Sequence, residues 1–216
     1  MKGRVFTAVI TLCLLFGMMF PKAAAAAFSD VPADSWYTAA VSYVRDNGLM
    51  NGTSDTAFSP DGTMTRAMLV TALHRAAGTP SVPMQPSYTD VPAAAWYSDA
   101  AAWAALEGLA GGYGDGRFGP DDPVSREQAA VILWRYAGRP QAQSAGEFTD
   151  ESAIASWAAD AVDWAWSSGV FSGRNGDDFS PQAGVTRAEA AAALCRCLTG
   201  GQEYSGASSS REVRHP

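Results

Sequence analysis

Three arginines follow directly after a helix-capping hydroxyl, and this placement could bind an anion. They are Arg66 after Thr65, Arg126 after Ser125 and Arg187 after Thr186. The dipole of a helix N-terminus disfavours a cation by about 0.3–1 kcal/mol, so an arginine that occurs there three times indicates another role. Free backbone N–H groups and a bidentate guanidinium together would form a site for a carboxylate or a phosphate. In the alternative interpretation, each arginine pairs with an aspartate of a neighbouring loop and only stabilises the fold.

The residues around these arginines predict the starts of three helices. Thr186 with Glu189 has the pattern of a complete capping box, in which the hydroxyl and the carboxylate satisfy backbone donors reciprocally. Ser125 with Gln128 has the same pattern, whereas the first copy has Met68 at this position and keeps only the hydroxyl cap. We therefore expect the first of the three helices to fray most easily.

The three helix starts belong to three aligned segments of the chain. Each segment has an aromatic residue two positions before an aspartate, then a tryptophan, two glycines, a Phe-x-Pro motif and the arginine. The aligned positions are Phe28, Tyr88 and Phe148; Asp30, Asp90 and Asp150; Trp36, Trp96 and Trp157; Gly48, Gly108 and Gly169; Gly52, Gly112 and Gly173; and Phe58, Phe118 and Phe179. Internal repetition at this length indicates a repeated supersecondary unit.

Each unit is predicted to contain two helices joined by a structured loop. In the first unit, apolar residues recur at helical spacing from Trp36 and Tyr37 to Val44, and Gly48 ends this helix. A second apolar series runs from Leu69 to Ala77. One helix pair cannot enclose its own apolar faces, so the three units are expected to bury them against one another. The sequence therefore predicts an all-α fold of three helix-loop-helix repeats in a pseudo-threefold bundle.

The order of these motifs resembles the S-layer homology domain of bacterial surface proteins, from Phe28 to about Gly200. The resemblance implies a three-pronged helical spindle that anchors exported proteins non-covalently to secondary cell-wall polymers, often polymers with pyruvate ketals on an amino sugar. It also implies that Arg66, Arg126 and Arg187 bind the acidic sugar in grooves between the repeats. A ketal-bound pyruvyl carboxylate is ionised at neutral pH, and arginine can meet it bidentately.

Three further sets of aligned residues are candidates for the same grooves. The tryptophans could offer a surface to a sugar, although an aromatic residue at helical spacing can equally belong to the core. The loop glycines could let the backbone approach a ligand, and the aspartates could either contact the ligand or cap a turn. These candidates are Trp36, Trp96 and Trp157; Gly52, Gly112 and Gly173; and Asp30, Asp90 and Asp150.

The units depart from the family pattern at several positions. Met68 and Gln128 replace the motif glutamate in the first two units, and Ala158 replaces the tyrosine that follows the tryptophan in the third. Glu151-Ser152 stands where the second unit has Val91-Pro92. One or two functional grooves are therefore expected rather than three equal ones.

The chain divides into a leader, three repeats and a tail. Residues 1–27 have the basic, apolar and alanine-rich regions of a secretory signal, which predicts an exported protein at the bacterial cell wall with no membrane span after cleavage. The repeats are placed at 28–80, 88–140 and 148–200, with linkers at 81–87 and 141–147. Residues 201–216 are polar, rich in serine and without periodicity, and are expected to be disordered.

The charge balance disfavours nucleic acid as a partner. The net charge is -7, and it becomes -10 after cleavage because three basic residues and no acidic residue leave with the signal. The partners expected are the cell-wall polymer and surface-layer proteins. Cys195 and Cys197 stand two residues apart in a predicted helix, so they point to different faces and no mutual disulfide is expected.

Two other classes of function use residues that this chain also contains. A cell-wall glycoside hydrolase needs only two carboxylates, but every plausible acid here lies in a triplicated turn, and no nucleophile or metal-ligand pattern is visible. A calcium-dependent protein-docking module would use the Asp- and Gly-rich loops, for example Thr53 to Gly62, yet these lack the EF-hand spacing and suit ordinary turns. The prediction is therefore a non-catalytic anchoring module without a cofactor or metal.

Overall fold

The computed structural model describes residues 28–83, 88–144, 146–174 and 177–201. Within these ranges the chain forms α-helices, one short 3-10 helix and isolated β-bridges, but no β-strand, which confirms the predicted all-α class. The helices are α1 (Thr38–Asp46), α2 (Arg66–Ala76), α3 (Ser98–Leu106), α4 (Arg126–Tyr136), η1 (Glu151–Ala153), α5 (Ala159–Ser167) and α6 (Arg187–Thr199). The predicted signal at 1–27 and all of the predicted tail after Gly201 lie outside the described residues.

The second helix of each unit begins at the predicted cap. In α4 and α6 both halves of the capping box are formed, by Ser125 with Gln128 and by Thr186 with Glu189. In α2 the Thr65 hydroxyl accepts a hydrogen bond from the Met68 N–H, but the methionine side chain cannot return one to the backbone. The three predicted hydroxyl caps and the two predicted capping boxes are therefore confirmed.

The first helix of each unit is shorter than predicted. Helix α1 begins at Thr38, so Trp36 and Tyr37 precede it instead of forming its first turn. Consecutive turns lead into the helix, since the N–H of Ser35 donates to Pro32 and the N–H of Thr38 donates to Ser35. Gly48, with φ +68°, follows the helix as expected of a C-terminal glycine.

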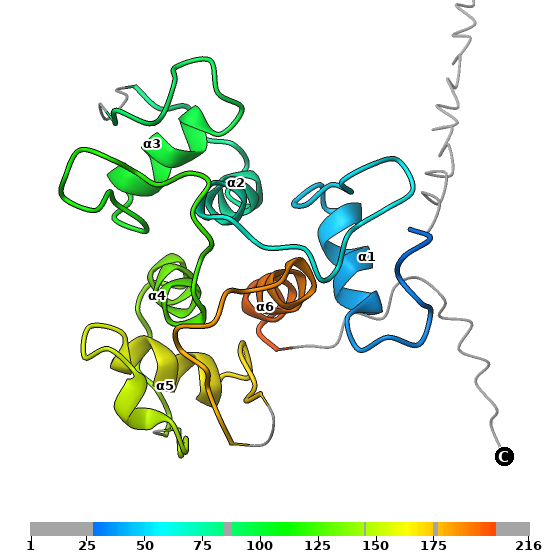
Figure 1. Cartoon of the computed structure of the whole chain (residues 1–216), viewed down its shortest axis with the longest axis vertical. Helices are drawn as coiled ribbons and strands as arrows, with labels where there is room; N and C mark the ends of the chain where they lie inside the picture. Colours follow the sequence, from blue (N-terminus) through cyan, green and yellow to red (C-terminus); the bar gives the residue numbers. More distant parts are fainter. Residues whose placement is uncertain (1–27, 84–87, 145, 175–176, 202–216) are drawn as a thin grey trace, which may run out of the picture.

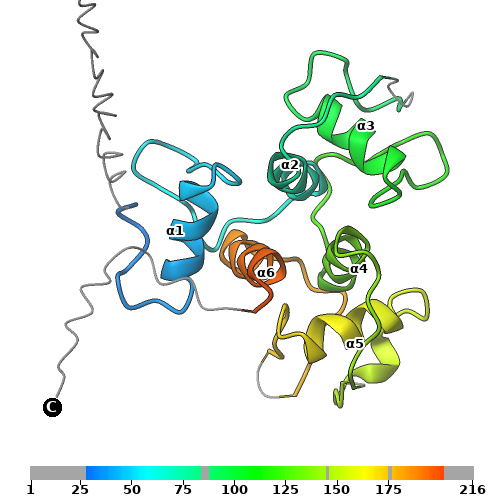
Figure 2. The same ribbon diagram turned by 180° about the vertical axis from the view of Figure 1, so that it is seen from behind.

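The packed helix pairs come from neighbouring units rather than from within one unit. Helix α2 packs against α3, α4 packs against α5, and α6 returns to pack against α1 of the first unit. Figures 1 and 2 show the result: α2, α4 and α6 gather in the middle, and α1, α3 and α5 lie outside them, one in each arm of a three-armed molecule. The core runs through all three interfaces as one continuous set of buried side chains.

A ring of three backbone hydrogen bonds joins the units where they meet. The N–H of Met64 donates to Val185 at 2.9 Å, that of Val185 to Val124 at 3.0 Å, and that of Val124 to Met64 at 3.0 Å. All three side chains are fully buried. The segments just before α2, α4 and α6 therefore hold one another, which confirms the pseudo-threefold arrangement.

Two further observations concern the described helices. No described helix is both long enough and apolar enough to cross a membrane. Cys195 and Cys197 of α6 are both free thiols, and Cys195 is buried.

Candidate functional site

The three motif arginines fasten each unit to the next. The Nε of Arg187 donates to the Phe58 carbonyl at 2.8 Å and its Nη2 donates to Asn51 at 2.7 Å. Its guanidinium lies over the Phe58 ring, 4.6 Å from the centroid. The same pattern joins Arg66 to Phe118 and Gly111, and Arg126 to Phe179 and Ser172. Each arginine thus bonds to backbone carbonyls, and not to a loop aspartate as the structural alternative proposed.

The backbone N–H groups at these helix starts are already used. The N–H groups of Arg66 and Ala67 donate to the carbonyls of Asp122 and Pro120, both at 3.0 Å, and the other two units repeat this arrangement. The third N–H of the turn donates to the capping hydroxyl. The expectation of free helix donors beside each arginine was therefore wrong, because loops of the next unit occupy them.

Burial lowers the pKa of two of the motif arginines, Arg126 and Arg187. Arg126 is only 2% exposed, and burial lowers its pKa to about 10 although the nearby Glu189 carboxylate opposes the shift. Burial also lowers the pKa of Arg187, with partial opposition from Asp30. Arg126 and Arg187 remain charged at neutral pH, and a charge with so little solvent attracts a counterion strongly.

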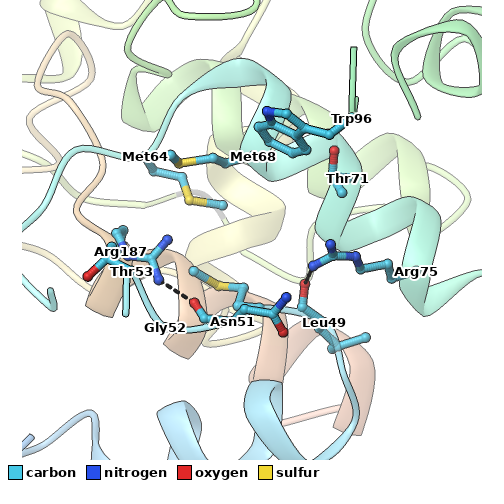
Figure 3. A pocket seen from close by; sticks show the side chains of 11 residues that line it. Leu49, Asn51, Gly52, Thr53, Met64, Met68, Thr71, Arg75, Trp96 and Arg187 are labelled. Atoms are coloured by element: carbon cyan, nitrogen blue, oxygen red, sulfur yellow. Dashed lines mark hydrogen bonds between the residues drawn. The ribbon is translucent and has the colours of Figure 1, made fainter. Parts of the chain in front are cut away.

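Each motif arginine reaches the edge of a cavity that we call a groove. Groove 1 has a volume of about 320 Å³, groove 2 about 210 Å³ and groove 3 about 220 Å³. Groove 1 is lined by Asn51, Gly52, Met68, Arg75, Trp96 and Arg187; groove 2 by Gly112, Tyr113, Gln128, Arg135, Trp157 and Arg66; and groove 3 by Gly173, Arg174, Glu189, Arg196, Trp36 and Arg126, among others. Figure 3 shows groove 1, with Met68 and Trp96 on one side and Leu49 and Asn51 on the other.

No groove is built by one unit alone. In groove 1 the loop and helix α2 come from the first unit, Trp96 comes from the second and Arg187 from the third. Grooves 2 and 3 repeat this rule, each with an arginine from the preceding unit and a tryptophan from the following one around the ring. The predicted arginine, tryptophan and glycine therefore meet in each groove because the three units close into a ring.

The tryptophans are walls of the grooves and not core residues. Trp36, Trp96 and Trp157 are 64%, 63% and 57% exposed, which excludes the core interpretation. They precede their helices, and Trp36 and Trp96 each pack edge-on against the adjacent Tyr37 or Tyr97. A planar, half-free indole beside a guanidinium suits the apolar face of a sugar ring.

The aspartates accept backbone N–H groups of the loops and do not line the grooves. The two carboxylate oxygens of Asp30 accept the N–H groups of Phe58 and Ser59 at 2.8 and 2.7 Å. Asp90 and Asp150 make the same pair of bonds in their own units. Burial opposes ionisation, but these N–H groups outweigh it and hold the pKa of Asp30 and of Asp90 below the usual value. The geometry thus gives these three candidates the turn-capping role.

The loop glycines are required by the loop itself. A Cβ on Gly52 would lie 2.4 Å from the Ser54 carbonyl oxygen, and one on Gly112 would lie 2.4 Å from that of Arg117. Both distances are far inside van der Waals contact. Gly52, Gly112 and Gly173 do line their grooves, so they also leave backbone open to whatever binds there.

Comparison with known families agrees with the repeat structure. The model of the S-layer homology domain matches residues 27–67, 87–130 and 147–191, which together make up more than half of the chain. The chain belongs to the S-layer homology domain family. The resemblance seen in the sequence motifs, with three tandem repeats, is thereby confirmed.

Curated relatives of this S-layer homology chain carry different names. It is 30% identical over 202 residues to the Surface-layer 125 kDa protein of Lysinibacillus sphaericus, covering 91% of this chain and 17% of that protein. It is 28% identical over 193 residues to the S-layer protein of Bacillus thuringiensis subsp. finitimus, covering 87% and 23%. It is 29% identical over 173 residues to the Amylopullulanase of Thermoanaerobacterium thermosulfurigenes, covering 77% and 9%. The chain thus spans less than a quarter of the length of these relatives.

Each S-layer homology unit also contributes a second arginine that the sequence analysis missed. Arg75, Arg135 and Arg196 follow the motif arginines by nine residues and line grooves 1, 2 and 3. Arg75 donates to Leu49 at 3.2 Å, and Arg135 donates to Leu109 at 3.0 Å. Their triplication at constant spacing was a signal in the sequence. It was overlooked because arginine in the last turns of a helix is ordinarily a solvent-exposed residue.

Among the described residues, no group of three or more histidine, cysteine, aspartate or glutamate side chains is arranged to hold a metal ion. The loop acids that suggested calcium have other partners in two cases: Asp115 pairs with Arg117 at 2.8 Å, and the Thr149 hydroxyl donates to Asp178. The residues that line the grooves include arginines and aromatic rings, and groove 3 also contains the Glu189 carboxylate.

Proposed function

We propose that this chain anchors an exported protein at the bacterial cell surface by binding an acidic cell-wall polysaccharide in its inter-unit grooves. Membership of the S-layer homology family and relatives named as surface-layer proteins support the anchoring role. The predicted signal at residues 1–27 supports export. The secondary cell-wall polymer, with pyruvylated amino sugars as the recognised units, is the partner that the family resemblance implies.

One observation carries the proposal: a guanidinium, an exposed indole and a glycine loop meet at the same place three times. The guanidinium can bind a carboxylate, the indole can cover the apolar face of a sugar ring, and the loop offers backbone groups to hydroxyls. In grooves 1 and 2, Nη1 of the motif arginine has no acceptor among the described residues, so it is available to a ligand.

The names of the relatives support anchoring over catalysis. Proteins named as hydrolases and proteins named as S-layer proteins share this segment, and in each of them it is a small part of the whole. A segment common to proteins with such different names supplies a function that is independent of the hydrolytic activity. Attachment to the cell surface fits this requirement.

Several weak grooves on one polymer chain would give strong attachment. A polysaccharide repeats its acidic sugar, so occupation of one groove raises the effective concentration of the next sugar at another groove. Linked sites of this kind raise avidity by about 10²–10⁴ when the geometry allows both to be filled.

The test uses tryptophans instead of the arginines, because the arginines also hold the units together. The full chain would be sedimented with purified cell-wall sacculi, before and after removal of the secondary polymer. A triple variant with Trp36→Ala, Trp96→Ala and Trp157→Ala should lose at least about 90% of the sedimented protein, since stacking residues of this type contribute several-fold each to binding. These side chains are more than half exposed, so the fold should be retained.

Leu106→Ala is the matched control, because Leu106 is 53% exposed and lines none of the three grooves. It should sediment like the unmodified chain. Binding that survives removal of the polymer, or a folded triple variant that sediments fully, would contradict the proposed function.

A further inference from the structure

The three grooves differ at the third residue of the helix that lines them. Groove 1 has Met68, groove 2 has Gln128 and groove 3 has Glu189. Only the glutamate is an anion, and it points at the cations of its own groove. Its Oε1 lies 3.3 Å from Nη1 of Arg126 and 2.8 Å from Nε of Arg174, and its Oε2 lies 2.5 Å from Nη2 of Arg174.

Glu189 therefore occupies the position that a ligand carboxylate would take in groove 3. Its side chain is 16% exposed and also accepts the Thr186 N–H at 2.9 Å, so it is held by four donors. Burial would raise its pKa, but the hydrogen bond from Arg174 and that from Thr186 lower it below the usual value. The glutamate is thus ionised at neutral pH, and an entering carboxylate would have to displace it.

Groove 1 has the opposite character. Arg187 and Arg75 line it, no described lining residue has a carboxylate side chain, and Met68 is apolar. Thr71 also lines the cavity, and its buried hydroxyl is the one buried side-chain polar atom of the described residues that has no hydrogen-bond partner. A buried hydroxyl without a partner is costly unless a ligand or water satisfies it. The equivalent residues in grooves 2 and 3 are Val131 and Ala192, which have no hydroxyl.

Groove 2 lies between these two cases. It has no carboxylate, but the Tyr113 ring covers the guanidinium of Arg66, with the charge centre 4.8 Å from the ring centroid. Tyr113 stands where groove 1 has Thr53 and groove 3 has Arg174. A ligand carboxylate can still reach Arg66, although with less room than in groove 1.

We propose that the grooves are unequal by construction: groove 1 is the principal site for a carboxylate-bearing sugar, and Glu189 closes groove 3 to such ligands as a built-in counterion. This inference rests on the proposed function, since it ranks the same three sites. It assigns Glu189 and Thr71 as residues that determine which groove is used.

Each groove contains one exposed tryptophan, so its indole N–H can report on that groove alone. The full chain would be labelled with ¹⁵N-tryptophan, and the signals of Trp36, Trp96 and Trp157 assigned by single Trp→Phe variants. The probe is the methyl glycoside of a pyruvate-ketal N-acetylhexosamine, with the unsubstituted N-acetylhexosamine glycoside as a neutral control. We expect the Trp96 signal to titrate at a concentration at least about tenfold lower than the Trp36 signal, because Arg187 meets no carboxylate among the residues that line groove 1, whereas Arg126 in groove 3 is paired with Glu189.

Three substitutions test the assigned residues, and a fourth is the control. Glu189→Gln should make the Trp36 signal respond to the probe, and the capping box should survive because Gln128 forms one with a glutamine. Met68→Glu should suppress the response of Trp96 by giving groove 1 its own counterion. Thr71→Val should weaken the Trp96 response several-fold without affecting Trp157. Glu151→Gln, which removes an exposed carboxylate outside the grooves, should change none of the three signals.

The outcomes separate this inference from the proposed function. Equal responses of all three signals in the unmodified chain would overturn the ranking and leave polysaccharide binding intact. Silence of Trp36 in a folded Glu189→Gln variant would overturn the role of Glu189. If no indole responds while the chain still sediments with the polymer, the grooves are not the binding sites, and both proposals fail.

Discussion

The guanidinium of Arg187 in the third unit lies 4.6 Å from the ring centroid of Phe58 in the first unit and donates to the carbonyl of that residue at 2.8 Å. This contact joins residues 129 positions apart and closes the ring of three units. The same side chain lines groove 1, so Arg187 contributes both to closure of the fold and to assembly of the groove.

Arg187→Ala should therefore destabilise the fold by about 2–5 kcal/mol, since it leaves two carbonyls without their donor and removes a stacked buried side chain. The measurement is urea-induced unfolding followed by tryptophan fluorescence. Arg196→Ala is the matched control, because Arg196 also lies in α6 and lines a groove but makes no side-chain hydrogen bond or ion pair with a described residue. A change within about 0.5 kcal/mol is expected for the control, and equal effects of both variants would refute the fastening role.

Two adjacent glycines should respond in opposite ways to substitution by alanine. Gly112→Ala places a Cβ 2.4 Å from the Arg117 carbonyl oxygen and 2.9 Å from the Tyr88 ring, so it should cost about 1–3 kcal/mol in the free energy of unfolding. Gly111→Ala meets nothing within 4 Å and should be neutral or slightly stabilising. Thermal unfolding of both variants measures the difference, and equal melting temperatures would show that the loop adapts.

The turn-capping aspartates predict a loss of stability in acid. The folded pKa values of Asp30 and Asp90 are below the usual 3.8, so their contribution is fully present above about pH 5 and is lost as the pH falls through the unfolded and then the folded value. Asp90→Asn should lower stability at pH 7 and should flatten the decline between about pH 5 and pH 3.

The control for this pH series is Asp34→Asn, which changes an exposed carboxylate to the same amide. Unfolding in urea at a series of pH values gives the slopes to be compared. If the free energy of unfolding of Asp90→Asn falls with pH as steeply as that of the unmodified chain, the two N–H groups do not favour the ionised carboxylate.

The incomplete cap of α2 predicts a local gain from Met68→Gln. Glutamine at this position in α4 accepts the N–H of the capping residue, and the equivalent N–H of Thr65 has no side-chain partner among the described residues. The substitution should slow amide hydrogen exchange in the first turn of α2 several-fold, which corresponds to about 0.5–1 kcal/mol. Met68→Leu, which cannot accept a hydrogen bond, is the control and should leave the exchange rates unchanged.

Local features of this protein followed from the sequence alone. Caps, C-terminal glycines and apolar spacing depend on residues close in the chain, so the second helices and the all-α class could be predicted from Thr65, Ser125, Thr186 and the residues after them. The repeats also placed Arg187, Trp96 and Gly52 among the binding candidates, because each of these types recurs once in every unit.

The tertiary structure decided what the repeats could not specify. The three units have nearly the same apolar faces, so the sequence does not determine which helices pack together. The pairing of α1 with α6 follows from closure of the ring. That closure buries the arginines on backbone carbonyls of the next unit and occupies the helix N–H groups, and it brings each groove together from three units. The start of α1 after Trp36 was likewise decided by turn hydrogen bonds and not by apolar spacing.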